Sequence, residues 1–489
     1  MMRSKRILAA LLAVVSAFSV AACGSSDSSG ATTGTTQAEN EARPEDYEDQ
    51  VEVEDTETIK SMEDIPESER QLRWLSYFDI NPTRANPETR TDLDLFQKKG
   101  GSIIYDKCSS TENYTKLANY ILAQDPPDIF WFETNMTFPF NVTRGMFQPV
   151  DSIVDFDSDL WKNVKETAEN YTINGKHYVA PVRYVTTSVI TYDKAMIEAA
   201  QLDDPYELYL DGQWTWDTWY DMMDEFVSGA TGDEVRYGVN GWFAPFIFYS
   251  TGKSIIMRNP ETDEYYSNLD DADLERAANL LYDVKKNNFY YNQWIGQASD
   301  CFKENILFYA MGPWASMDSH TPKEDEEWGN VPMPKDPNTD TLYYIPDIET
   351  YMWVNGSKKD VAVKTWLECA KTVTTDEKYK EIDKEKFFTT NPQWTEDMYK
   401  VGYELLDDDT YTKIMDPGRG ISTVISDDYA ANNDTLEAVN SYMYTSVMKE
   451  DENGAQFTWA VLKEQYRGTI ESELKTFNEE YKKYKEENP

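Results

Sequence analysis

The chain has 489 residues and is strongly acidic, with 46 Lys and Arg against 89 Asp and Glu and a formal net charge of −43. A protein of this charge is repelled by nucleic acid and by anionic lipid, so the sequence excludes both as direct partners. The length indicates two or three domains behind any targeting segment.

Residues 1–22 have the pattern of a signal peptide, in which three basic residues precede an apolar stretch too short to span a bilayer. The run Val20-Ala21-Ala22-Cys23 resembles the lipobox of bacterial lipoproteins. We therefore expect a lipid on Cys23 and anchoring to the extracellular face of the cell membrane, of the Gram-positive type. The alternative is an ordinary secretory signal with a chance cysteine. Loss of the three basic residues takes the charge from −43 to −46.

Residues 23–69 are rich in Gly, Ser, Thr, Asp and Glu and nearly lack aromatic side chains. Such a segment buries too little apolar surface to offset its ordering entropy. We expect it to be a disordered tether between the lipid and a globular body. No later stretch is long and apolar, so the lipid is the only membrane attachment expected.

The body begins with alternating strands and helices. Period-two patterns predict strands near residues 72–77, 102–105 and 128–132. A helix is plausible over 88–99, and apolar spacing predicts another over 114–122, which Pro126-Pro127 ends. This alternation is typical of a parallel α/β sheet.

Later in the chain, amphipathic helices predominate. Thr215 is expected to cap a helix whose apolar face carries Trp219, Met222, Met223 and Phe226. Further helices are expected around residues 274–284, 363–373 and 470–484, and a short strand at 331–335.

The sequence has few cysteine and histidine residues that could bind a metal ion or a cofactor. Cys108, Cys301 and Cys369 remain beside the lipid-bearing cysteine, an odd number that argues against a disulfide framework and leaves a single bridge open. His177 and His320 are the only histidines. No nucleotide-binding or zinc-protease motif occurs, so we expect no cofactor and no metal.

Aromatic residues are in excess, with 14 Trp, 33 Tyr and 20 Phe. Trp242 follows Asn240-Gly241, and Trp314 follows Gly312-Pro313, so both lie in turn-rich contexts. Flat rings stack on the apolar faces of sugars, while carboxylates and amides bind the hydroxyls. The alternative is that these rings belong to a large core.

Several short motifs occur in a characteristic order behind the lipobox. They are Pro127-Asp128-Ile129-Phe130, Pro149-Val150-Asp151, Asn174-Gly175-Lys176, Thr215-Trp216-Asp217-Thr218-Trp219, Met311-Gly312-Pro313-Trp314 and Pro332-Met333-Pro334. With this order the chain resembles the extracellular solute-binding proteins of bacterial ABC importers, the broad group that includes maltose-binding protein. The likeness covers most of residues 70–489.

The resemblance implies a two-lobe α/β fold of the periplasmic-binding-protein type (type II), with the ligand in a cleft between the lobes. Lobe one would comprise residues 70–182 and 343–395, and lobe two residues 183–342 and 396–489. The crossings would lie near residues 181–184 and 329–342. In open α/β sheets, ligands bind beyond the carboxyl ends of the strands.

The resemblance also implies ligand-binding residues. Trp131 and Glu133 end a strand on one face; the alternative is a core Trp131 and a solvated Glu133. Arg183 and Tyr184 lie at the first crossing, where the alternative is an inter-lobe salt bridge.

Three more aromatic residues complete the expected site. Trp242 lies in a loop after a strand, and Trp314 matches the Gly-Pro-Trp position of the family; for each the alternative is the core. Tyr351 and Trp353 alternate on one strand, so at most one of them contacts the ligand, and we place Tyr351 in the site.

The leading hypothesis is a monomeric binding protein that captures a sugar or oligosaccharide and delivers it to the permease subunits of an ABC importer. One alternative is a secreted carbohydrate-active enzyme with a carboxylate pair. Another is a sensing or adhesion lipoprotein without a transport role. Arg183 leaves open whether the ligand is neutral or anionic.

Overall fold

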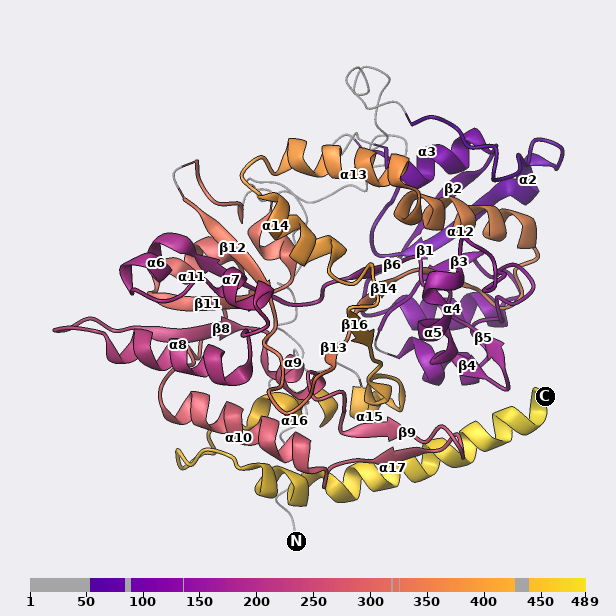
Figure 1. Cartoon of the computed structure of the whole chain (residues 1–489). Helices are drawn as coiled ribbons and strands as arrows, with labels where there is room; N and C mark the ends of the chain where they lie inside the picture. Colours follow the sequence, from indigo (N-terminus) through magenta and orange to yellow (C-terminus); the bar gives the residue numbers. More distant parts are fainter. Residues whose placement is uncertain (1–52, 84–88, 135, 318–319, 325, 427–438) are drawn as a thin grey trace, which may run out of the picture. The chain divides into compact units, whose positions relative to one another are not determined.

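The first sheet, sheet A, joins strands from the start of the body with one from much later in the chain (Figure 1). Its order is β15 (Tyr351–Trp353), β3 (Ile129–Trp131), β1 (Gln71–Ser76) and β2 (Ser102–Lys107). β1 is parallel to β2 and β3, and β15 is antiparallel to β3. The strands expected near residues 72–77, 102–105 and 128–132 are thus confirmed as neighbours in a mostly parallel sheet.

Helices α3 (Thr91–Lys98) and α12 (Asp360–Thr375) pack together next to this sheet. Phe96 of α3 meets Trp366 of α12 with ring centroids 5.3 Å apart, and both side chains are fully buried. Burial of such large apolar side chains supplies the main driving force for holding the helices on the sheet.

The second sheet, sheet B, has the order β12 (Trp328–Pro332), β7 (Val189–Asp193), β11 (Ile306–Met311) and β8 (Tyr237–Gly241). β8 and β11 are parallel, whereas β7 is antiparallel to both of its neighbours. Helix α8 (Trp216–Ser228) packs on β8 and begins at the predicted cap, since Thr215 Oγ1 accepts a hydrogen bond from the Thr218 amide. Its apolar face is buried as the spacing predicted.

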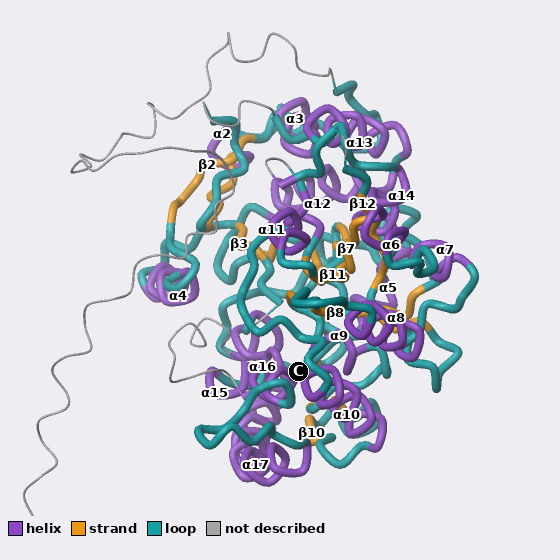
Figure 2. Tube along the Cα trace, turned by 90° about the vertical axis from the view of Figure 1, so that its left-hand side faces the viewer, coloured by secondary structure: helices purple, strands orange, loops and turns teal. Residues whose placement is uncertain are grey.

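The remaining helices and short strand pairs lie around and between these sheets (Figures 1 and 2). The helices are α2 (Glu67–Arg70), α4 (Asn113–Leu122), α5 (Lys165–Glu169), α6 (Lys194–Ala199), α7 (Pro205–Leu210), α9 (Ala244–Tyr249), α10 (Ala272–Lys286), α11 (Ala298–Lys303), α13 (Glu377–Thr390), α14 (Glu396–Tyr399), α15 (Thr423–Ser426), α16 (Val439–Ser446) and α17 (Trp459–Glu487), with the short turns η2 (Thr137–Asn141), η3 (Lys162–Val164), η4 (Pro313–Ser316), η6 (Lys400–Glu404) and η7 (Pro417–Gly420). The two-stranded pairs are β4 (Thr172–Ile173) with β5 (Lys176–His177), β9 (Ile256–Arg258) with β10 (Tyr265–Ser267), β13 (Leu342–Tyr344) with β16 (Tyr411–Lys413), and β6 (Arg183–Val185) with β14 (Asp347–Glu349).

This computed structural model describes residues 53–83, 89–134, 136–317, 320–324, 326–426 and 439–489. The signal peptide, Cys23 and the expected tether up to residue 52 lie outside these residues. The chain divides into one unit of residues 1–50 and 81–89 and another of residues 51–80 and 90–489. Every element above belongs to the second unit. No helix among the described residues is long and apolar enough to cross a membrane.

Two strands connect the sheets. β6 runs into β7 of sheet B, and β14 runs into β15 of sheet A. The two pair antiparallel, with Tyr184 opposite Ile348. β6 begins at Arg183, within the segment expected for the first crossing. The return crossing was expected at residues 329–342, but β12 still belongs to sheet B up to Pro332, and the chain reaches β15 of sheet A only after β13 and β14.

The segment before β1 requires a correction. Residues 53–69 were expected to be part of the tether, but Val53, Ile59 and Met62 are at most 4% exposed and belong to the main core. The amino group of Lys99 also lies 2.6 Å from the Asp55 carboxylate. The sequence misled because three isolated apolar residues in a polar segment give no periodic pattern.

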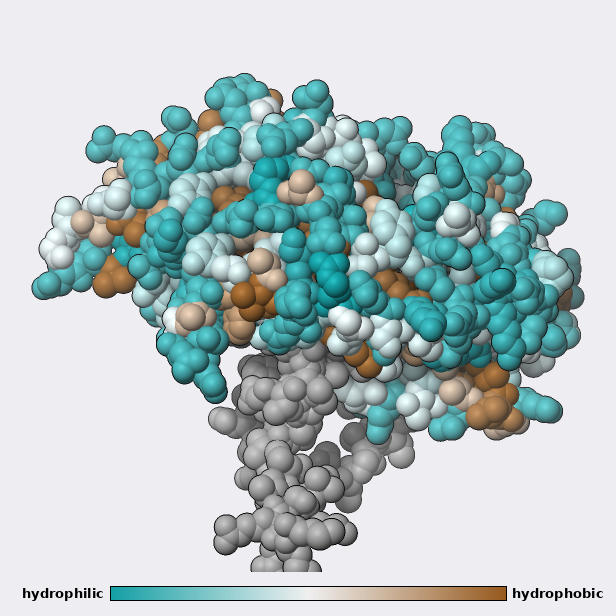
Figure 3. Space-filling model, turned by 90° about the horizontal axis from the view of Figure 1, so that it is seen from below, coloured by the Kyte–Doolittle hydropathy of each residue, from teal (hydrophilic) through white to brown (hydrophobic). Residues whose placement is uncertain are grey.

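Helix α17 contacts different parts of the body near its start and near its end. Lys463, near its start, pairs with Glu275 of α10 at 3.2 Å. Near its end, the Tyr484 hydroxyl lies 3.2 Å from that of Tyr178, next to β5. The last helix thus reaches residues that the sequence assigned to the other lobe. Seen from below, the surface is mostly hydrophilic, in keeping with the acidic composition (Figure 3).

Candidate functional site

Trp131 lies at the carboxyl end of β3, at the edge of sheet A where ligands of open α/β sheets bind. Its ring meets the edges of Phe78 and Tyr351, each with centroids 5.4 Å apart, and that of Trp74 at 6.1 Å. The side chain is half-buried. The aromatic cluster therefore fixes the orientation of Trp131 while leaving part of the indole accessible.

Glu133 follows two residues later and is a buried acid with a raised pKa. Its backbone amide donates to Thr137 Oγ1 at 3.1 Å, and its Oε1 is buried without a hydrogen-bond partner among the described residues. Burial raises the pKa of Glu133 to about 7; Asp347 adds to this effect, while a hydrogen bond from Tyr77 opposes it. A buried carboxyl with an open acceptor can bind a ligand hydroxyl.

A second carboxyl lies next to this loop. Asp347, the first residue of β14, accepts a hydrogen bond from the Thr134 hydroxyl at 3.3 Å. Burial raises its pKa, and the charge of Arg419 counteracts part of that effect. The surroundings of Glu133 and Asp347 are therefore acidic and poorly solvated.

Trp242 follows β8 at the corresponding edge of sheet B. Gly241 has φ +105°, and a side chain there would meet the Ala310 carbonyl, so only glycine makes this turn. The Trp242 amide then donates to the Ala310 carbonyl at 2.6 Å, and Ser188 Oγ donates to the Trp242 carbonyl at 3.0 Å. The half-buried indole is thus held by its backbone at the end of the strand.

Trp314 lies at the same edge, after β11. Its side chain is 57% exposed, and its indole lies so close over Gly312 that a Cβ there would be 2.4 Å from Nε1. Pro313 and Ala315 on either side are buried. A rigid turn therefore presents an exposed indole, so Trp314 is not a core residue.

Arg183 lies on β6 and forms a salt bridge with Glu349. Its Nε and Nη2 donate to Glu349 Oε2 on β14 at 3.1 and 2.9 Å. The Glu349 charge raises the pKa of Arg183 further above its ordinary value. The salt bridge weighed as the alternative is therefore present, between the two crossing strands.

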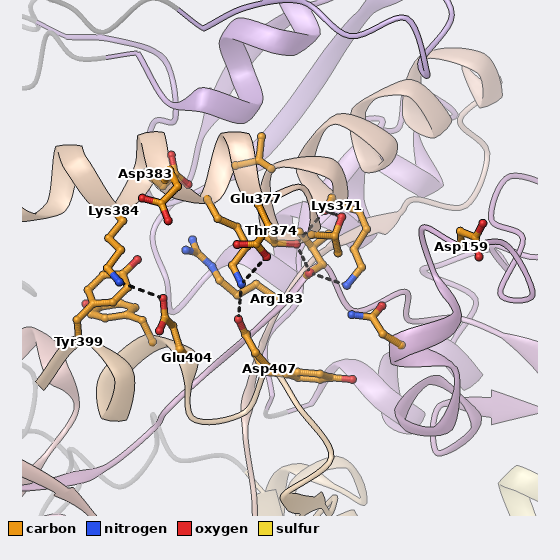
Figure 4. Close-up of a pocket in the computed structure, with 18 residues that line it drawn as sticks. Asp159, Arg183, Lys371, Thr374, Glu377, Asp383, Lys384, Tyr399, Glu404 and Asp407 are labelled. Atoms are coloured by element: carbon orange, nitrogen blue, oxygen red, sulfur yellow. Dashed lines mark hydrogen bonds and ion pairs between the residues drawn. The ribbon is translucent and has the colours of Figure 1, made fainter. Parts of the chain in front are cut away.

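A cavity of about 330 Å³ lies beside Arg183 (Figure 4). Helix α13 and turn η6 border it and are linked by the Lys384–Glu404 ion pair at 3.7 Å, and Lys380 of α13 also pairs with Asp407, just after η6, at 3.0 Å. Lys371 of α12 is buried there, with Nζ donating to the Val182 carbonyl at 3.1 Å, and burial lowers its pKa to about 7. This cavity is lined mainly by charged side chains and contains none of the four residues at the sheet edges.

Two of the expected residues are enclosed. Tyr184 is 6% exposed, with the Lys413 ammonium 5.2 Å from its ring centre. Tyr351 is 3% exposed; its ring packs against Trp74 and Trp366, and its hydroxyl accepts a hydrogen bond from Arg90 at 3.3 Å.

The structure thus brings Trp131 and Glu133 to the edge of sheet A and Trp242 and Trp314 to the edge of sheet B. The sequence reading missed Asp347, which carries no local signal because its importance comes from burial beside Thr134. Among the described residues no cluster of acids, cysteines or histidines could hold a metal ion, and Cys108, Cys301 and Cys369 are free thiols.

Solved structures with the same fold span most of the chain. An ABC substrate-binding protein from Listeria monocytogenes, in complex with cycloalternan, is 15% identical, with a TM-score of 0.54 over 82% of this chain and 98% of its own. The sugar-binding protein MalE from Xanthomonas citri is 13% identical, with a TM-score of 0.55 over 84% and 98%. UgpB from Mycobacterium tuberculosis, in complex with glycerophosphocholine, is 14% identical, with a TM-score of 0.57 over 83% and 99%. No curated protein sequence matches the chain.

Mixed sheets joined by crossing strands, with side chains gathered at the strand ends, define a binding protein of the periplasmic-binding-protein type. Residues 86–376 match the family described as bacterial extracellular solute-binding protein, and the chain belongs to that family. It is therefore a solute-binding protein, a member of a family of binding proteins rather than enzymes.

Proposed function

We propose that this protein captures a neutral carbohydrate between the carboxyl edges of sheets A and B and delivers it to an ABC importer. The observation that carries the proposal is Trp314, an indole 57% exposed on a turn whose flanking residues are buried. Leaving a large apolar ring in water is unfavourable. A sugar face can cover the indole, and the turn that carries it need not become more ordered on binding. The Listeria protein in complex with cycloalternan and the Xanthomonas sugar-binding protein support the same class of ligand.

The charges favour a neutral ligand over a uronic acid. The Arg183 guanidinium is neutralised by Glu349, so it is a poor partner for an anion. Glu133 and Asp347 contribute buried carboxyls at the edge of sheet A. A ligand carboxylate beside them would add like charge in a poorly solvated place, whereas hydroxyl groups can donate to them.

In this proposal, Trp131 and Glu133 contact the ligand from one side and Trp242 and Trp314 from the other. Tyr351 and Tyr184 support the site from inside, since both are buried. The proposal keeps the lobe boundaries expected from the sequence, with β14 in the return crossing and residues 53–69 assigned to the body. Rotation about β6 and β14 would close the lobes, because a ligand that touches both favours the closed state.

We also propose that the mature chain is a monomer held by a lipid on Cys23 at the extracellular face of the membrane, where it meets the permease. The family description supports the extracellular location. Replacing Cys23 with alanine should release the protein into the medium or leave an unprocessed precursor. A processed variant that stays on the membrane would refute the anchor.

The ligand class is tested by calorimetry of the body, residues 51–489, against neutral oligosaccharides of the malto-, xylo- and galacto- series and against oligogalacturonates of matched length. The expected result is micromolar or tighter binding within one neutral series. Tight binding of only the acidic series contradicts the neutral ligand. No carbohydrate binding at millimolar concentration contradicts the proposed function.

A further inference from the structure

Trp294 is an exposed tryptophan that the sequence reading did not single out. Its side chain is 65% exposed, and among the described residues only Trp294 and Trp314 are exposed tryptophans. The other tryptophans are buried or half-buried. A single exposed apolar residue is normal on a protein surface, so what distinguishes Trp294 is the backbone that carries it.

The segment before Trp294 extends the edge of sheet B. Gly238 and Val239 of β8 both donate to the Phe289 carbonyl, at 2.8 and 2.9 Å, and the Tyr291 amide donates back to the Val239 carbonyl at 3.0 Å. Tyr290 forms a parallel bridge with Val239. Because the segment runs in the direction of β8, it leaves the sheet at the edge where Trp242 follows that strand.

The backbone on both sides of Trp294 is held by hydrogen bonds from side chains. The buried amide of Asn240 donates to the carbonyls of Tyr291 and Gln293, at 2.8 and 2.7 Å. The Tyr309 hydroxyl donates to the Ile295 carbonyl at 2.8 Å. The exposed indole therefore projects from a loop whose carbonyls on either side are held by buried side chains of β8 and β11.

Trp294 and Trp314 each precede a residue of one apolar cluster. Ile295 and Ala315, the residues that directly follow the two tryptophans, are buried in the same apolar cluster beside sheet B, and Trp242 packs partly against it. Trp242, Trp294 and Trp314 therefore all lie next to one apolar cluster. A stacking platform needs an accessible ring on a fixed backbone, and Trp294 meets that requirement through its held neighbours and its exposed side chain.

We infer that Trp294 is a second stacking platform and that the ligand is an oligosaccharide with rings on both Trp294 and Trp314. This inference rests on the proposed function and extends it, since a monosaccharide covers one indole at most. The platform on Trp294 binds outer rings of the chain. Short ligands that occupy the site around Trp314 do not reach it.

The test compares Trp294→Ala with the wild type over neutral malto-, xylo- and galacto-oligosaccharides of one to six rings, by calorimetry. Loss of most of one ring's contact weakens the longer members of the bound series about ten-fold and leaves the shortest members unchanged. Trp294→Tyr, which keeps a flat ring, restores most of the affinity. Leu210→Ala, which removes an exposed apolar side chain at the end of α7, serves as the control and has no effect.

Equal affinities of wild type and Trp294→Ala for every member would overturn the inference while the proposed function stands. An equal loss for short and long members would also overturn it, since the variant would then disturb the whole site. A wild type that binds only monosaccharides removes the second platform, and one that binds no carbohydrate refutes both proposals. Light scattering checks self-association: a dimer that Trp294→Ala dissolves would assign the indole to an interface instead.

Discussion

Arg183 and Glu349 join the two crossing strands through a shared oxygen: Nε and Nη2 of the arginine both donate to Oε2 of the glutamate, at 3.1 and 2.9 Å. The side chains are 32% and 30% exposed, so the pair is only partly screened by water. The contact links β6 to β14, the strands about which we propose that the lobes rotate.

Replacing Arg183 with methionine should lower the free energy of unfolding by about 1–2 kcal/mol, since it removes two charge-assisted hydrogen bonds from a partly buried carboxylate. Urea unfolding measures the change. Glu349→Gln should cost a similar amount, and the double variant less than the sum of the two. Neutral ligands should keep their affinity. Additive losses in the double variant would show that the two residues do not act as a pair.

A protein that starts at residue 65 should be less stable than one that starts at residue 51 by about 3–6 kcal/mol. The shorter form loses the side chains of Val53, Ile59 and Met62 from the core, and each such side chain contributes about 1.5–3 kcal/mol when fully buried. Calorimetric melting of both forms gives the comparison. Equal melting temperatures would return residues 53–64 to the tether.

The sequence predicted those features that follow from local periodicity. Helix α8 carries Trp219, Met222 and Phe226 on one buried face because their spacing matches a helical turn. The enclosure of Tyr351 could not be predicted, since its neighbours Trp74, Trp131 and Trp366 come from three other elements.

The exposure of the tryptophans shows the same limit. Trp242 and Trp314 both lie in glycine-containing turns, yet only Trp314 is strongly exposed. Trp294 lies in a similar polar context, and its environment depends on Asn240 and Tyr309 reaching across from sheet B. A turn signal locates a loop, but the packing of distant residues decides which side chain stays in water.

Replacing Trp314 with alanine should weaken sugar binding about ten- to a hundred-fold and leave the melting temperature within a few degrees of wild type. The indole is 57% exposed, so its removal opens no large cavity, whereas its contact with a sugar face is worth about 1.5–3 kcal/mol. Calorimetric titration and melting are measured on the same preparation.

The matched control is Trp219→Ala, because Trp219 is fully buried and its loss should cost about 3–5 kcal/mol of stability. If Trp314→Ala melts as low as this control, the indole supports the fold. If Trp314→Ala binds the identified ligand as tightly as wild type, the residue lies outside the site.

Glu133 should make the stability of the protein depend on pH between about 4.5 and about 7. The pKa of its carboxyl rises from 4.5 in the unfolded chain to about 7 in the folded protein, mainly because of burial. Below pH 4.5 the group is neutral in both states, and its contribution is fully present. As the pH rises toward 7, the unfolded chain releases the proton while the folded protein retains it, so folding loses about 2–3 kcal/mol across this window.

Glu133→Gln removes this titration, because an amide stays neutral at every pH. The variant should therefore be more stable than wild type at pH 8 by about 2 kcal/mol, with a smaller difference at pH 4.5, as measured by urea unfolding at each pH. Asp347 still titrates in the variant, since burial raises its pKa as well, and some pH dependence remains. Glu385→Gln, on the exposed face of α13, serves as the control and should leave the profile unchanged. A Glu133→Gln profile parallel to that of wild type would show that Glu133 ionises freely in the folded protein. The inference that Glu133 and Asp347 lie in poorly solvated surroundings would then be wrong.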